Sequence, residues 1–122
     1  MRERVQVYSL AMEYQNGSLL SILSFNILYG GTHLGQPLNQ TAKVIETAGA
    51  DVVVLCEHIG NARPLADRLA LHCHEVTAPP YRDSVAVLSR FPMIETFDHG
   101  VRLGLTEGET ACVFGVHLSS SP

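Results

Sequence analysis

The stretch that decides the fold is "DVVVLCEH", residues 51–58. An apolar run of this kind is typical of a strand covered on both faces, as in the sheets of α/β proteins. Strand alternation places Asp51, Val53, Leu55 and Glu57 on one face, with Glu57 where the strand gives way to a loop. Ligand sites of α/β sheets favour the carboxyl ends of strands. The stretch therefore predicts a buried strand that carries Glu57 to such an edge.

The residues before this strand predict a hairpin. Residues 5–14, "VQVYSLAMEY", alternate roughly with a period of two, and Asn16 and Gly17 form a pair that tolerates positive φ in a tight turn. Residues 18–28, "SLLSILSFNIL", are apolar on both faces at first, which suits a central strand. Asn26 interrupts one face near the end of this strand, so it is the unexpected polar residue there.

Two helices are predicted on either side of residues 51–57. Apolar residues recur at spacings of three and four at Leu38, Ala42, Ile45 and Ala48. Gly49 is placed to end this first helix in the left-handed conformation. Asn61 is placed as the N-cap of the second helix, whose inward stripe is Leu65 and Leu69.

Further strands are predicted at "HEVT" (74–77), "SVAVLS" (84–89), "MIETFDH" (93–99) and "TACVFGVHL" (110–118), separated by segments rich in Gly, Pro and charge, among them "LGLTEGE" (103–109). Hairpin signals thus coexist with strand-helix-strand units. The predicted fold class is α/β, with a mixed β-sheet that carries its helices on one face.

Composition excludes several classes of protein. The chain has 122 residues, 46% of them hydrophobic, which fits one compact domain. A net charge of −4 without a basic cluster gives no strong nucleic-acid signal. No window approaches the roughly 18 apolar residues of a membrane span, and the N-terminus lacks the apolar region of a signal peptide, so we expect a cytoplasmic protein. Cys56, Cys73 and Cys112 are odd in number and lie in apolar or strand-like runs, which favours reduced thiols.

Four segments, in order, resemble the endonuclease/exonuclease/phosphatase superfamily, which has the deoxyribonuclease-I-like fold. They are "LSFNILYGG" (23–31), "ADVVVLCEH" (50–58), "SVAVLSRFPMIE" (84–95) and "VFGVHL" (113–118). The resemblance covers nearly the whole chain. It implies that residues 1–122 form the N-terminal half of such a domain, and that the mixed sheet is the first half of a four-layer αββα sandwich.

The resemblance also implies a site. Asn26 matches the family's first-strand Asn, which lies by the metal and the scissile phosphate. Glu57 matches the principal carboxylate ligand of a divalent metal, and His117 matches a His that contacts the phosphate. The turn at residues 89–92, "SRFP", matches a turn that we interpret as mainly structural. Cys56 departs from the family's frequent Gln before the Glu, a difference that bears on how this carboxylate is supported.

The chemistry of these side chains suits magnesium or manganese. Mg²⁺ prefers oxygen ligands and keeps several waters, so one carboxylate, one amide oxygen and a substrate phosphate are a sufficient set. Glu57 is then the ligand, Asn26 orients the metal-bound water or the substrate, and His117 donates to the phosphate. The expected function is metal-dependent hydrolysis of a phosphodiester or phosphomonoester, with the substrate class open.

Each of these residues also has a purely structural interpretation. Glu57 also fits a simple strand terminator, Asn26 a residue that hydrogen-bonds a loop, and His117 a hydrogen-bonded core histidine. His72 and His74 share a strand face with Glu75 nearby, which suggests zinc, although no distant Cys or His pair completes four ligands. We assign no role to His58.

The family's downstream motifs, Asp-x-Asn and a terminal Ser-Asp-His, do not occur in these residues. The alternative function is therefore a catalytically inactive half-domain that acts as a binding or interaction module. The two predicted helices can cover only one face of the sheet. We expect the other face to lack cover in this half, and the isolated segment to self-associate through it.

Overall fold

The structure, a computed structural model, describes residues 6–15, 18–26, 37–76 and 85–115. The elements in chain order are β1 (Gln6–Gln15), β2 (Ser18–Asn26), α2 (Pro37–Ala48), β3 (Val52–Cys56), α3 (Ala62–Leu69), β4 (His72–Glu75), β5 (Val85–Ser89), β6 (Met93–Phe97), β7 (Gly100–Gly104), the 3-10 turn η2 (Thr106–Gly108) and β8 (Thr110–Phe114).

Within these residues a five-stranded main sheet has the order β1-β2-β3-β5-β4. β2 and β3 are parallel, whereas the other neighbours are antiparallel. The predicted mixed sheet is thus confirmed. The hairpin register pairs Gln15 with Ser18, and the predicted turn residues Asn16 and Gly17 lie outside the described residues.

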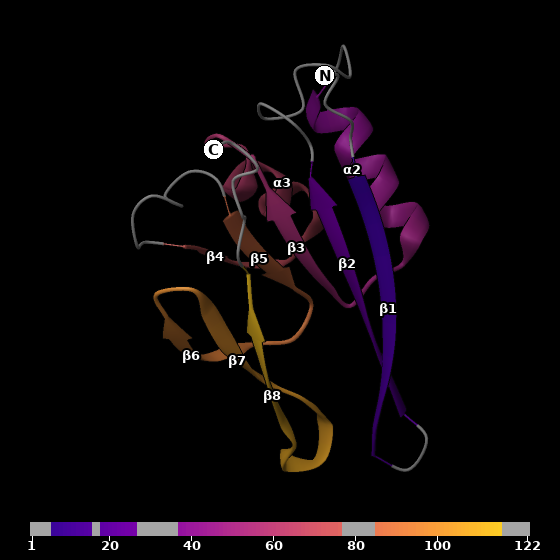
Figure 1. The fold of residues 1–122 in the computed structure, drawn as a ribbon, viewed down its shortest axis with the longest axis vertical. Helices are drawn as coiled ribbons and strands as arrows, with labels where there is room; N and C mark the ends of the chain where they lie inside the picture. Colours follow the sequence, from indigo (N-terminus) through magenta and orange to yellow (C-terminus); the bar gives the residue numbers. More distant parts are fainter. Residues whose placement is uncertain (1–5, 16–17, 27–36, 77–84, 116–122) are drawn as a thin grey trace, which may run out of the picture.

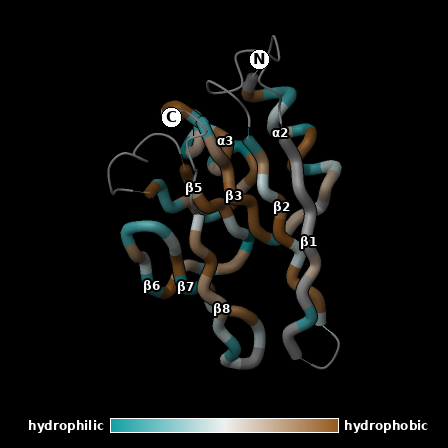
Figure 2. Tube along the Cα trace, in the orientation of Figure 1, coloured by the Kyte–Doolittle hydropathy of each residue, from teal (hydrophilic) through white to brown (hydrophobic). Residues whose placement is uncertain are grey.

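Both helices pack on one face of the main sheet, behind the strands in Figure 1. Their contact forms a core of buried residues on β2, β3, β5, α2 and α3: Leu23, Phe25, Ala42, Ile45, Val53, Leu55, Ala62, Leu65, Ala66, Ala86 and Leu88. Figure 2 shows hydrophobic residues along β3, the strand predicted to be covered on both sides. In the described part of the chain, no helix is long and apolar enough to cross a membrane.

The helix ends follow the sequence in part. Gly49 has a φ of +62° just after α2, as predicted. Asn61 occupies the N-cap position of α3, but its side chain makes no capping hydrogen bond. Leu65 is fully buried and Leu69 packs at the edge of the same core, which confirms the predicted stripe. Helix α3 ends at Ala70, a non-glycine residue in the left-handed conformation.

A second, three-stranded sheet, β6-β7-β8, packs on part of the opposite face of the main sheet. Its inward residues Val101, Leu103 and Val113 meet a buried set on the main sheet: Leu20, Val52 and Val87. The expectation that this face lacks cover was therefore wrong for its central part. The cause is the short connection between β5 and β6, which turns the chain back over the sheet.

Strand β7 was missed in the sequence because glycines bound it. A Cβ added at Gly100 would lie 2.3 Å from the carbonyl oxygen of Val113. At this position β7 is therefore closer to β8 than a residue with a side chain would allow. Gly100 pairs with Phe114 and Gly104 with Thr110 in this sheet. Glycine here marks close strand packing rather than a break in the strand.

A polar network holds β2, β3 and the turn after β5 in register. The nearly buried Asp51 accepts hydrogen bonds from the Ser21 N–H (2.9 Å), from the Ser21 hydroxyl (3.3 Å) and from the Arg90 guanidinium. The Arg90 N–H also donates to the Asp51 carbonyl at 3.0 Å. The "SRFP" turn therefore has a structural role, because its arginine anchors the start of β3.

Candidate functional site

Strands β2 and β3 bring Asn26 and Glu57 to the same edge of the main sheet. Their parallel register pairs Asn26 with Cys56, and Glu57 is the next residue along the chain. Neighbouring strands lie about 4.8 Å apart, so the two backbones are adjacent. Both residues are half-buried. The arrowheads of β2 and β3 in Figure 1 mark this edge.

The loop after β3 has an unusual backbone. Glu57 has a φ of +57° and Ile59 a φ of +45°, and Gly60 follows at +80°. Positive φ is uncommon without glycine and a real outlier for a β-branched residue such as Ile. Strand alternation therefore ends at Cys56, and the prediction that Glu57 continues the face of Leu55 was wrong. Strained backbone of this kind clusters at ligand sites and switch regions.

His58, to which the sequence assigned no role, lies fully buried inside this loop. Its Nδ1 accepts a hydrogen bond from the Gly60 N–H at 3.1 Å, and its carbonyl accepts one from the Asn61 N–H at 3.0 Å. Nδ1 can accept only when it carries no proton. His58 thus stabilises the turn that follows Glu57. In the sequence, the only signal of this role is the position of His58 between Glu57 and Gly60.

Cys56 packs beneath the site as a neutral thiol. It is buried with Val76 and Val85. Burial, and secondly the negative charge of Glu57, raises the pKa of Cys56 to about 11. A thiol with this pKa is a weak nucleophile and a weak hydrogen-bond donor at neutral pH. Cys56 therefore contributes packing at the position before Glu57.

Strand β8 approaches the same region from the second sheet. A Cβ added at Gly115 would lie 2.8 Å from Val85 Cγ1 and 2.9 Å from Val54 Cγ1, so the backbone of Gly115 packs directly on β3 and β5. The Gly115 N–H donates to the His99 carbonyl at 2.8 Å. His117 itself lies outside the described residues. Gly115 nevertheless packs the end of β8 against Val54, which lies three positions before Glu57 in the chain.

No family model, curated protein or solved structure matches this chain.

The histidines suggested for zinc belong to a different part of the fold. His72 and His74 lie on β4, at the other edge of the main sheet from β1. His72 is exposed, whereas His74 Nε2 lies 2.8 Å from the Phe97 carbonyl oxygen and so links β4 to β6. Among the described residues no group of three or more His, Cys, Asp and Glu side chains could hold a metal. His74 therefore has a structural contact between the two sheets.

Asn26 and Glu57 offer donors of the kind that magnesium prefers. An amide oxygen and a carboxylate at adjacent strand ends are hard ligands, and Mg²⁺ completes its octahedron with water and substrate oxygens. Asn26 and Glu57 are thus oxygen donors of the class that magnesium and manganese take.

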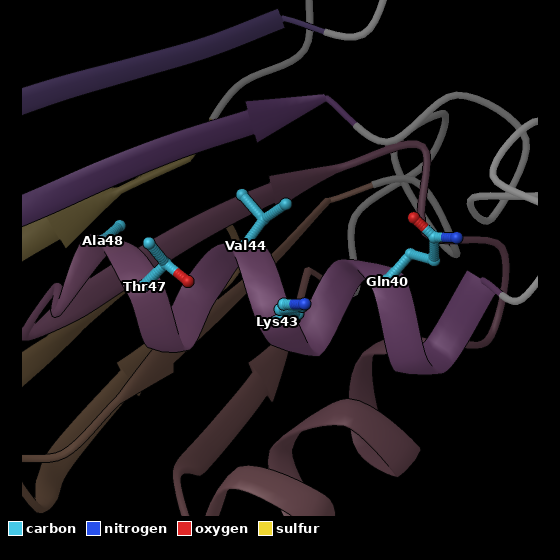
Figure 3. A pocket seen from close by; sticks show the side chains of 5 residues that line it. All are labelled: Gln40, Lys43, Val44, Thr47 and Ala48. Carbon is cyan, nitrogen blue, oxygen red and sulfur yellow. The ribbon is translucent and has the colours of Figure 1, made fainter.

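A separate hollow lies on α2, away from these residues. It has a volume of about 430 Å³ and is lined by Gln40, Lys43, Val44, Thr47 and Ala48. Figure 3 shows that all five side chains come from this helix. The lining includes no carboxylate and no histidine, so the hollow does not share the donor chemistry at the ends of β2 and β3.

Proposed function

We propose that this chain contributes the metal-binding half of a metal-dependent phosphoesterase site. The observation that carries the proposal is the meeting of Asn26 and Glu57 at the carboxyl ends of two adjacent parallel strands. Glu57 would hold Mg²⁺ or Mn²⁺, and Asn26 would orient a water or a substrate oxygen beside it. When bound, the ion neutralises charge on the phosphoryl oxygens of the substrate.

His117 is proposed to donate to the phosphate. Its support is the position of Gly115, which packs on Val54 and Val85 of the main sheet. The residues of this site thus come from β2, from the loop after β3 and from the chain after β8.

We further propose that the fold of this chain is the first half of a four-layer αββα sandwich. The helices on one face of the main sheet and the β6-β7-β8 sheet on the other support it. The Asp-x-Asn and Ser-Asp-His motifs that the resemblance implies do not occur in these residues. Hydrolysis in this proposal requires those groups. The proposed substrate class is a phosphodiester or a phosphomonoester.

A titration of Mn²⁺ followed by the relaxation rate of water protons tests the metal role of Glu57. We expect a dissociation constant of about 10⁻³ M, because a single carboxylate leaves the ion mostly hydrated. Glu57→Gln keeps the shape of the side chain but removes its charge, and should weaken binding at least about tenfold. Glu46→Gln, an exposed carboxylate on α2, is the matched control and should titrate like the wild type. Equal titrations for the wild type and Glu57→Gln would show that Glu57 is not the ligand.

A second candidate function is an interaction module without catalysis. The observation that favours it is the exposure of large apolar side chains on the second sheet, where Phe114 is 59% exposed and Ile94 is 57% exposed. This surface lies on different residues from the metal site, so one chain can bind a partner here and a metal at Glu57.

A further inference from the structure

The outer face of the β6-β7-β8 sheet presents an unusual group of side chains to solvent. Because Val101, Leu103 and Val113 point inward, alternation places Arg102 and Phe114 on the outer face. Glu95 pairs with Arg102 and Phe97 with Gly100 in the register of β6 and β7, so they share this face. We call this set the outer-sheet patch: Ile94, Glu95, Phe97, Arg102, Cys112 and Phe114.

Two glycines on β7 lie beneath apolar side chains of the patch. A Cβ added at Gly100 would lie 2.6 Å from Phe114 Cδ1, so the ring of Phe114 covers the place that a side chain would take. A Cβ added at Gly104 would lie 3.2 Å from Ile94 Cγ2. Apolar groups from β8 and β6 thus lie over the glycines of the central strand.

The patch is also ordered by contacts among its own members. The rings of Phe97 and Phe114 stack with centroids 5.8 Å apart and an interplanar angle of 23°. The Arg102 guanidinium lies 5.9 Å from the centre of the Phe97 ring and pairs with Glu95 Oε1 at 2.8 Å. Aromatic residues and arginine are the residue types enriched at the centres of protein interfaces. Held in place before binding, these side chains lose little conformational entropy on association.

We propose that the outer-sheet patch is the interface of a homodimer, with a second copy of this chain packed on it across a two-fold axis. The argument is charge complementarity. In a two-fold interface each contact between two residues occurs twice, so Arg102 of each copy can meet Glu95 of the other. One cation and one anion within an apolar patch make the surface complementary to itself. The exposed face of a sheet also suits face-to-face packing of two sheets at about 10 Å.

This surface differs from the one that the sequence suggested for self-association. The central part of the main sheet is already covered by β6, β7 and β8. The exposed apolar residues Ile94 and Phe114 instead lie on the far side of that cover. The second sheet thus buries one face inside the molecule and uses its other face for the dimer. In the isolated chain the second copy takes the place of the fourth, helical layer of the proposed sandwich.

Sedimentation velocity of the purified chain tests the oligomeric state. We expect a dimer at about 10⁻⁴ M that dissociates on dilution, because small interfaces are usually weak. Phe114→Ser should give a monomer at the same concentration. Leu19→Ser removes an equally exposed apolar side chain, 60% exposed on β2, and should remain a dimer. A wild type that stays monomeric, or a Phe114→Ser variant that still dimerises, would overturn the proposal.

A charge-exchange experiment separates the interface from folding. Arg102→Glu places two anions in the patch and Glu95→Arg places two cations, so each variant alone should be monomeric. An equimolar mixture of the two variants should form a heterodimer, because opposite charges then face each other. Pairing within one chain cannot produce this result. Circular dichroism checks that both variants keep the wild-type fold. Dimers in either single variant would contradict the proposed contact. A mixture of the two folded variants that stays monomeric would also contradict it.

Discussion

At the scale of single residues, Gly115 shows how one missing side chain positions a strand. Its backbone lies so close to β3 and β5 that a Cβ would overlap Val54 and Val85. Interior contacts of this kind tolerate little added volume, because protein cores are close-packed. Gly115 therefore determines how near the end of β8 comes to the strand that carries Glu57.

Gly115→Ala should reduce the free energy of unfolding by about 1–3 kcal/mol, the usual cost of an extra methyl in a filled core. Val54→Ala removes one of the two atoms that the new methyl meets, and should recover part of this loss in the double variant. Urea denaturation of the wild type, the two single variants and the double variant measures the coupling, which we expect to exceed about 0.5 kcal/mol. Additive effects would mean that Gly115 does not pack on Val54.

At the scale of elements, the loop between β3 and α3 departs most from what its residues prefer. The left-handed conformation at Glu57 and Ile59 has no local signal, because neither residue type favours it. The boundaries of β3 were predictable from its apolar run, whereas the conformation of the loop depends on the buried His58 and its bond to Gly60. Local sequence patterns do not contain such contacts, so they predicted that Glu57 lies at the end of β3 but not the conformation of its backbone.

Ile59→Gly should raise the free energy of unfolding by about 0.5 kcal/mol. The left-handed conformation costs a non-glycine residue about 1–2 kcal/mol, and the added entropy of glycine in the unfolded chain offsets part of that gain. Ile59 is 54% exposed, so loss of its side chain removes little packing. Ala70→Gly, at the left-handed end of α3, is the matched control and should give a similar gain. A loss above about 1 kcal/mol in Ile59→Gly alone would show that the Ile59 side chain stabilises the loop.

At the scale of the whole molecule, the mixed α/β class and the one-sided helices followed from periodicity. The stripes on α2 and α3 and the two-sided apolar character of β3 and β5 are properties of short segments. The second sheet was not predictable in the same way. Its position depends on contacts of Val52 and Val87 with residues of β7 and β8, which follow later in the chain. Its central strand, β7, begins and ends with glycine and so lacks the pattern of a strand in the sequence. Long-range packing therefore decided the layer that sequence patterns missed.

The same packing gives each layer a separate role in our account. The main sheet carries Asn26 and Glu57 at its carboxyl edge, and the Ser21, Asp51 and Arg90 network holds the strands in register from the other end of β3. The second sheet brings Gly115 to β3 on its inner side and presents the outer-sheet patch on the other. Metal binding and dimerisation are thus expected to be independent, with no variant of the patch altering the affinity for Mn²⁺.

The central claim is that Asn26 and Glu57 form one metal site, and paramagnetic broadening by Mn²⁺ tests it most directly. Trace Mn²⁺, added to the ¹⁵N-labelled chain, shortens the relaxation of amide protons close to the ion. We predict that the amide signals of Asn26, Cys56 and Glu57 broaden first, while those of Gly104 and Thr110, on the second sheet, stay sharp. Broadening centred on His72 and His74, or equal broadening of all exposed amides, would contradict a metal site at the ends of β2 and β3.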